Sequence, residues 1–429
     1  MSESKPVNEG AMGQEARCPY SFEAPDFIVT DERHVEAPFE FYRKLRHEQP
    51  VFDSVELGSV VLSRYQDVRE GFRDHRRLAS KGSLEGAARL APEVVEMLEA
   101  HDATLRNFIA NVDQPQHTRL RRSVSKPFSV RSMAKLAPQV RVEAAKLIRE
   151  LMPLGRADLV KQFSNILPAR VTAAFLGIPL EHTGQVHRWV SDWFDLFFTP
   201  LPLEEQRKRA EGYIEYVGYM KKLIEERRRK PTEDFMSQVI ASINDGTADL
   251  NEDELIGLMT SISLGGNDTT GNQIAVLFHR LLTEGNSWER VVKEPDIRDS
   301  AIEESIRIDG AGIGGFRVAT QDIEVPGGTI PAGVKVFLNQ DSADHDETVF
   351  QDPETFLVDR VNAGDNIGFG AGIHHCLGAP LARMELRQVL DVMTELLPTL
   401  RIGEGAERRF RPSVVQRALL SLPVEWEVP

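Results

Sequence analysis

Hydrophobic and polar positions follow a helical repeat over most of the chain. Between residues 118 and 282, apolar side chains recur every three to four positions, which predicts long amphipathic helices. A shorter helical pattern follows Pro38, and another begins at Leu381. Residues 80–110 follow neither period, and we expect mixed, loop-like structure there.

Two parts of the chain change to a strand-like pattern. Residues 51–55 and 59–63 are short β-like runs separated by Leu57-Gly58, which predicts a hairpin. Between 310 and 350 the period shifts toward strands again, and the segment 325–333, rich in Pro and Gly, supplies turns. The patterns therefore predict a mainly α-helical chain with small β-sheets, in the α+β class.

Composition narrows the class of protein. The 429 residues contain no internal linker or low-complexity block, so we expect residues 31–429 to form a single domain after a flexible segment 1–30. There are 51 Lys and Arg residues against 66 Asp and Glu, and the formal net charge is −15. This charge disfavours non-specific binding to nucleic acid or to an anionic membrane.

No feature of the sequence indicates export or membrane insertion. The first twenty residues lack the basic and apolar regions of a signal peptide, and no apolar stretch reaches the length of a membrane span. The only cysteines are Cys18 and Cys376, so no disulfide framework is expected. We therefore expect a cytoplasmic protein without a membrane partner.

The most informative segment is 369–383, where Cys376 lies in a glycine-rich loop before the helix predicted from Leu381. Glycines at positions 370, 372 and 378 remove Cβ atoms around the sulfur, so backbone can lie close to a flat cofactor. The N-terminus of the following helix should favour the thiolate and lower the thiol pKa. Thiolate ligation of haem iron is the chemistry that fits.

Two other interpretations of this segment are a buried free cysteine and a zinc site. The first is the default for a lone cysteine near a glycine-rich turn. The second would use His374, His375 and Cys376, but adjacent residues seldom point at one tetrahedral ion, and no second Cys/His cluster exists to complete the site.

Segment 369–383 resembles the haem-binding signature of the cytochromes P-450, Phe-Gly-x-Gly-x-His-x-Cys-x-Gly followed by Ala-Arg, and it meets every fixed position. The resemblance covers the chain from about Pro38 to the end and is to the soluble bacterial type. It implies a triangular, helix-rich single domain with haem b between a distal and a proximal helix. It also implies that Cys376 is the axial ligand of the iron.

The segment 264–270 is the second motif. Gly265, Gly266 and Asn267 together cost roughly 2 kcal/mol of helix propensity relative to alanine, so we expect a kinked or locally unwound helix there. A Thr hydroxyl can also bond the carbonyl one turn back. The segment resembles the oxygen-activation motif of the P-450 distal helix, which implies that Thr269 hydrogen-bonds dioxygen and that Asp268 relays protons.

Basic residues near position 120 divide between two helix faces. His117 and Arg121, one turn apart, share a semi-buried face, where a cationic pair calls for an anion. The P-450 pattern assigns this pair to the haem propionates, and Arg317 and His374 resemble two further propionate ligands. The opposite face is expected to be a solvated basic surface, and it carries Arg119, Arg122 and Lys126.

Glu304 and Arg307 stand at i, i+3, where an exposed pair would contribute only a few tenths of a kcal/mol. The pair fits the Glu-x-x-Arg element of the P-450s, and Arg360 follows at the family's distance. The resemblance implies a buried network of these three residues that fixes the loop leading to Cys376. Its role would be structural.

The resemblance implies a haem-thiolate monooxygenase that uses O2 to hydroxylate or epoxidise an apolar small molecule, for example a terpenoid, a steroid or a polyketide-like compound. The chain shows no flavin, nicotinamide or iron–sulfur unit after the haem segment, so we expect electrons from a separate ferredoxin and ferredoxin reductase, or from a flavodoxin. A peroxide-driven peroxygenase and a non-catalytic haem sensor are the alternatives. Retention of Asp268 and Thr269 argues against both.

Four segments are expected to line the substrate pocket: 80–98, 189–198, 310–316 and 414–416. The aromatic residues within 189–198 are expected to be ordinary helix packing. The basic face is the expected docking surface for an acidic electron carrier.

Overall fold

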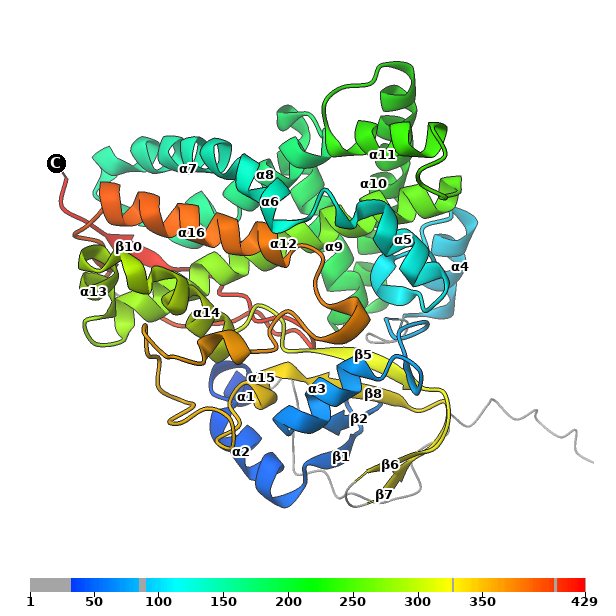
Figure 1. The fold of residues 1–429 in the computed structure, drawn as a ribbon, viewed down its shortest axis with the longest axis horizontal. Helices are drawn as coiled ribbons and strands as arrows, with labels where there is room; N and C mark the ends of the chain where they lie inside the picture. The colour runs from blue at the N-terminus through cyan, green and yellow to red at the C-terminus, as the bar shows by residue number, and fades with distance from the viewer. Residues whose placement is uncertain (1–31, 85–89, 326–327, 405–406, 429) are drawn as a thin grey trace, which may run out of the picture.

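The computed structural model describes residues 32–428 apart from 85–89, 326–327 and 405–406 (Figure 1). The predicted flexible segment 1–30, with Cys18, lies outside the described residues, as do two residues of the predicted turn at 325–333. No helix in the described part of the chain is long and apolar enough to cross a membrane.

Helices make up most of the described structure, and the predicted class, mainly α with small sheets, is confirmed. The α-helices are α1 (Glu32–Glu36), α2 (Phe39–Glu48), α3 (Tyr65–Arg73), α4 (Pro92–Ala100), α5 (Gln116–Ser125), α6 (Val130–Met133), α7 (Ala137–Leu151), α8 (Leu167–Leu176), α9 (Thr183–Phe198), α10 (Leu203–Arg229), α11 (Phe235–Asn244), α12 (Glu252–Thr283), α13 (Ser287–Lys293), α14 (Arg298–Ile308), α15 (Gln340–Ala343) and α16 (Ala379–Leu396).

The strands form three small sheets. Their bounds are β1 (Val51–Ser54), β2 (Ser59–Leu62), β3 (Leu78–Ala79), β4 (Arg156–Asp158), β5 (Gly314–Ala319), β6 (Ile323–Val325), β7 (Gly328–Ile330), β8 (Lys335–Asn339), β9 (Arg401–Ile402) and β10 (Pro423–Glu425). The five-stranded sheet has the order β1-β2-β8-β5-β3, the three-stranded sheet the order β4-β10-β9, and β6 pairs with β7.

The predicted hairpin is confirmed: β1 pairs antiparallel with β2, with Val51 opposite Leu62. Strand β2 then pairs in parallel with β8, so a segment from the start of the described chain lies beside one from residues 335–339. In Figure 1 this sheet lies below the helical part, with α3 beside it. The strand-like pattern of 310–350 accounts for β5 to β8.

Helix α12 runs through the middle of the helical part (Figure 1), and α8, α9, α10, α14 and α16 contact it. A capping box begins the helix: the Asn251 side chain accepts from the Glu254 N–H, and the Glu254 carboxylate accepts from the Asn251 N–H. Leu255 and Leu264 belong to one buried apolar cluster and Phe278 to another. The glycine-containing turn lies between these two clusters.

Of the two expected forms, a kink or a local unwinding, the unwinding is wrong, because α12 is a continuous α-helix from Glu252 to Thr283. Gly266 serves close packing, since a Cβ there would lie 2.7 Å from Thr172 Oγ1 of α8. The predicted bond of a Thr hydroxyl to the preceding turn is present, since Thr269 Oγ1 donates to Gly265 O over 2.6 Å.

Two further expectations need correction. Residues 92–100, expected to be loop-like, form α4, because Pro92 stands in the first turn and Val94 and Leu98 bury one short apolar face. Residues 156–158, within the stretch expected to be helical, form β4, because β10 pairs with them. A partner more than 260 positions away leaves no local pattern.

Candidate active site

The loop that carries Cys376 lies between a single 3-10 turn, Gly372–His374, and helix α16. The Cys376 N–H donates to Phe369 O over 2.9 Å. Gly372 has φ +71°, and a Cβ there would lie 2.5 Å from Phe72 O at the end of α3. Only glycine allows the loop to approach α3 this closely with that backbone conformation.

The Cys376 side chain is exposed, although protein groups lie close enough to affect its ionisation. Desolvation by these groups raises the pKa of the thiol. The backbone N–H groups of Gly378 and Ala379 and the charge of Arg121 lower it, but by less. The expectation of a net lowering is therefore wrong for the protein chain alone. The helix N-terminus contributes as predicted, but desolvation outweighs it. A cation bound to the sulfur would favour the thiolate.

The four predicted propionate ligands gather around this loop. The rings of His117 and His374 lie 4.0 Å apart between centroids. Arg121 Nη2 donates to the carbonyl of His375 over 2.7 Å, and buried Arg317 donates through Nη1 to Phe316 O over 2.6 Å. The structure thus brings together four residues from α5, β5 and the cysteine loop.

The cluster formed by the four predicted propionate ligands carries positive charge and has little negative charge nearby to neutralise it. Neither Arg121 nor Arg317 forms an ion pair with any residue that the structure describes. Nε2 of His117 and Nε2 of His374 are buried without a hydrogen-bond partner in the same part of the chain. Burial lowers the pKa of Arg317 to about 10, and that of His117 to about 4, with Arg121 as the second cause. Such a set of donors fits a dianionic group.

Space is open on one side of α12. Gly265 is exposed although Leu264 and Asn267 beside it are buried, and a Cβ on Gly265 would meet no atom within 4 Å. Thr269, one turn later, lies on the same side of the helix. The Thr269 hydroxyl donates its hydrogen to Gly265 O. The hydroxyl oxygen can therefore act only as an acceptor toward a group in this open space.

Asp268, by contrast, faces the protein. Its side chain is only 7% exposed, and its Oδ1 lies 3.4 Å from Nδ1 of His187 on α9. Sequence reasoning missed His187, since it stands 81 positions before Asp268 and belongs to no motif. Only the packing of α9 on α12 brings the two residues together.

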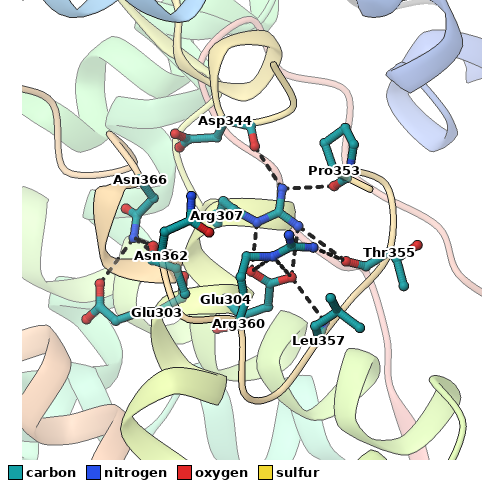
Figure 2. Close-up of polar contacts among 12 residues, drawn as sticks. Glu303, Glu304, Arg307, Asp344, Pro353, Thr355, Leu357, Arg360, Asn362 and Asn366 are labelled. Carbon is teal, nitrogen blue, oxygen red and sulfur yellow. Dashed lines mark hydrogen bonds and ion pairs between the residues drawn. The ribbon is translucent and has the colours of Figure 1, made fainter. Parts of the chain in front are cut away.

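The predicted network of Glu304, Arg307 and Arg360 is present and buried (Figure 2). Arg307 donates to both Glu304 oxygens over 2.7 and 2.9 Å, and Arg360 Nε donates to both over 2.9 Å. Arg307 also donates to the carbonyl of Asp344 over 2.8 Å, and Asp344 Oδ1 accepts from the Ile367 N–H at the start of the cysteine loop. The network therefore supports the path to Cys376.

Three of the four predicted lining segments meet in the structure. The Ile313 N–H donates to Val415 O over 2.9 Å, and the Val414 N–H donates to Phe198 O over 3.4 Å. The fourth, 80–98, is described only in part. The aromatic residues of α9 pack as expected: Trp193, for example, stacks on Phe108 with ring centroids 5.9 Å apart.

Comparison with known proteins places this site in a family. A family model described as Cytochrome P450 matches residues 37–395. The chain is 33% identical over 370 residues to a mycinamicin IV hydroxylase/epoxidase of Micromonospora griseorubida, which covers 85% of this chain and 89% of that one. It is 31% identical over 391 residues to a vitamin D(3) 25-hydroxylase of Pseudonocardia autotrophica, covering 90% and 93%.

Among solved structures, the heme domain of a Tepidiphilus thermophilus P450 aligns with a TM-score of 0.87 at 28% identity, over 94% of this chain and 96% of that one. A helix-rich fold with this cysteine loop defines a haem-thiolate class of protein, and the family implies haem as the cofactor. The chain belongs to the cytochrome P450 family, of the bacterial type, and is a P450 monooxygenase.

Proposed function

We propose that this monooxygenase hydroxylates or epoxidises an apolar, medium-sized molecule of the polyketide, steroid or terpenoid kind. The observation that carries the proposal is the exposed Cys376 thiol beside four cationic or donor groups that lack an anion. The named activities of two relatives, on a mycinamicin and on vitamin D(3), support a substrate of this size and polarity.

The proposed cofactor is haem b. Cys376 would bind the iron, and His117, Arg121, Arg317 and His374 would bind the two propionates. The donor set supports this assignment, because its guanidinium groups form no ion pair among the described residues and its two imidazole Nε2 atoms lack a partner, which suits two carboxylates, and because its sulfur receives backbone N–H groups. Bound haem would supply an iron at which O2 is reduced, with thiolate donation promoting O–O cleavage.

The protein's own part in catalysis is to supply and direct protons. Asp268 would hold a proton close to the site, and Thr269 would accept a hydrogen bond at the edge of the open space beside Gly265. Together they would deliver protons so that one oxygen atom leaves as water and the other enters the substrate. The segments that meet at Phe198, Ile313 and Val414 would hold the substrate on that side.

Electrons are proposed to come from a separate ferredoxin and its reductase, or from a flavodoxin. The cytoplasm, where such carriers and NAD(P)H are supplied, is the proposed location. Residues 31–429 are proposed to act as one catalytic domain, in keeping with a family match over residues 37–395.

The ferrous–CO spectrum tests the ligand. The wild-type protein should give the red-shifted Soret band of thiolate ligation, and Cys376→Ser should lose it, because an alcohol is a poor donor to iron. Cys18→Ser is the matched control and should keep the band. A Cys376→Ser variant that binds haem and retains the band would contradict the assignment.

Turnover tests the reaction. Mycinamicin IV, vitamin D3 and testosterone should be screened for a low-to-high-spin shift of the haem spectrum, and each compound that gives a shift should be incubated with ferredoxin, reductase and NAD(P)H. We expect an oxygenated product that contains one atom from 18O2. Product formed with peroxide alone, at the same rate, would support a peroxygenase instead.

A further inference from the structure

His187 and Asp268 form an isolated buried contact between α9 and α12. His187 Nδ1 lies 3.4 Å from Asp268 Oδ1. Both atoms are buried, and neither has a hydrogen-bond partner in the described structure. Each atom is therefore an unpaired polar neighbour of the other, and a small rotation of the imidazole would convert the contact into a hydrogen bond.

The histidine also reaches the surface. Its side chain is 30% exposed, whereas that of Asp268 is 7% exposed. Because Nδ1 is buried, the exposed area belongs to the remainder of the side chain. His187 thus combines a buried nitrogen beside Asp268 with side-chain surface that solvent can reach.

Apart from His187, the charged groups of α9 are engaged with other residues. On α9, Asp192 accepts from Arg209 of α10, and Asp195 lies 3.7 Å from the same arginine. Arg411 lies 3.8 Å from Asp195. Further along α9, Arg188 donates to Gln185, and on α8 Arg170 pairs with Glu143. Among the described residues, His187 is the one basic side chain at ion-pair distance from Asp268.

We propose that His187 supplies protons from solvent to Asp268 and holds that carboxyl in position. It is a positioning residue for oxygen activation, since it acts through Asp268. The inference rests on the proposed role of Asp268 and Thr269, and it extends the proton path from α12 to the protein surface.

The proposed step is a simple proton transfer. The Nδ1–H bond of the imidazolium breaks as an O–H bond forms on Asp268, and the ring is left neutral with its hydrogen on Nε2. Water then returns a proton to Nδ1 after the exposed ring turns outward. No group is oxidised or reduced in this transfer.

Two substitutions separate proton supply from positioning. His187→Gln keeps a hydrogen-bond donor for Asp268 but cannot carry a proton, whereas His187→Phe removes both functions. The matched control is His182→Gln, because His182 is exposed just before α9 and contacts Tyr219 instead of Asp268. All three proteins should first show the thiolate-type ferrous–CO band, so that a failure of the haem assignment is recognised separately.

The kinetic test is NADH oxidation with a ferredoxin and its reductase, in H2O and in D2O, without added substrate. We expect His187→Gln and His187→Phe to slow NADH oxidation by about tenfold, which is less than the roughly 10²–10⁴-fold typical of a general acid–base group because His187 acts through Asp268, with an increased solvent isotope effect. His182→Gln should behave as wild type. A His187→Gln enzyme with wild-type rate and isotope effect would overturn proton supply, even if His187→Phe were impaired.

A second measurement does not depend on turnover. In the ferrous–CO protein labelled with 15N-histidine, the ring nitrogen shifts of His187 report where its hydrogens lie. Asp268→Asn should change these shifts, and Asp192→Asn, on the same helix as His187, should leave them unchanged. Unchanged His187 shifts in Asp268→Asn would show that the two side chains do not interact, and would overturn the proposal whatever the kinetics show.

Discussion

Thr269 is held by its own helix, through a 2.6 Å bond from Oγ1 to the carbonyl of Gly265. This bond fixes the hydroxyl at the edge of the open space beside Gly265. We predict that Thr269→Ala still binds haem and substrate but diverts NAD(P)H to peroxide, with product per NAD(P)H reduced by about tenfold or more. The measurement is the ratio of product and peroxide to NAD(P)H consumed.

The neighbouring Thr270 provides the control for this prediction. Its side chain is buried on another side of α12, so Thr270→Ala should keep most of the coupling. Equal coupling in wild type and Thr269→Ala would rule out the proposed role of the Thr269 hydroxyl.

Asp341 should make stability depend on pH. Burial raises its pKa to about 7, with Arg417 opposing and Asp309 adding to the shift. An acid whose pKa is higher in the folded state binds more protons there than when unfolded, so stability falls as pH rises from about 4 to about 7. Asp341→Asn, which resembles the neutral form, should remove this loss.

Urea unfolding of the two proteins at pH 5 and pH 8 measures the effect. Because one pKa unit corresponds to about 1.4 kcal/mol, the unfolding free energy of wild type minus that of Asp341→Asn should decrease by more than about 1 kcal/mol between these pH values. A difference that is the same at both pH values would show that Asp341 does not titrate in this range.

Among single residues, those that belong to a motif were predictable and those defined by packing were not. Cys376, Thr269 and the pair of His117 and Arg121 each belong to a short motif that resembles one of the family, and the structure places Cys376 near Arg121 and His117 beside His374. His187 was not, because its partner lies on another helix and a lone histidine on an amphipathic helix has no distinguishing pattern. The direction of the Cys376 pKa was wrong for a similar reason: desolvation depends on the whole surrounding structure.

At the scale of elements, the Glu304 network joins α14 to the segment that leads to Cys376 (Figure 2). Both guanidinium groups are buried, and the Leu357 N–H also donates to Glu304. We predict that Glu304→Gln lowers the unfolding free energy by about 3–5 kcal/mol, because it leaves the charges of Arg307 and Arg360 buried without a counter-charge. Equilibrium unfolding in urea measures this.

Glu294→Gln is the matched control for the buried network. Glu294 pairs with Arg290 over 3.2 Å, but its side chain is 48% exposed. Exposed pairs contribute about 1 kcal/mol or less, so this variant should unfold almost as wild type does. Equal destabilisation by the two substitutions would show that burial of the Glu304 network is not what matters.

Element types were predictable where the periodicity was long, as in α7, α9, α10 and α12. Short elements were not: α4 was expected to be a loop and β4 part of a helix. The glycines of α12 are unfavourable for a helix, but the local unwinding expected from them is absent. At Gly266 the close approach of α8 leaves no room for a side chain, which only the tertiary structure shows.

At the scale of the whole molecule, a net charge of −15 contrasts with the basic surface of α5. Arg122 and Lys126 are exposed there, as predicted. The prediction that Arg119 belongs to this solvated surface is wrong, because Arg119 pairs with the buried carboxylate of Glu254 and also contacts Asp249. The structure therefore limits the proposed docking surface to Arg122 and Lys126.

We predict that reduction by ferredoxin slows as salt rises, because a contact between exposed charges is screened over about 8 Å at physiological ionic strength. Arg122→Glu should slow it further while leaving substrate-induced spectral shifts intact. Lys222→Glu, an exposed lysine on α10, is the control and should have little effect. If stopped-flow reduction rates change neither with salt nor in Arg122→Glu, ferredoxin docks on another surface.

The sheets of this fold join early parts of the chain to late ones. Strand β2 needs β8, and β4 needs β10, which follows β4 by more than 260 residues. During synthesis, the edge of β2 that pairs with β8 and the edge of β4 that pairs with β10 therefore remain unpaired until those later strands are made. The nascent polypeptide can therefore form strand pairs with other molecules during most of its synthesis. Slow translation or loss of β10 should reduce the yield of native enzyme more than the activity of each folded molecule.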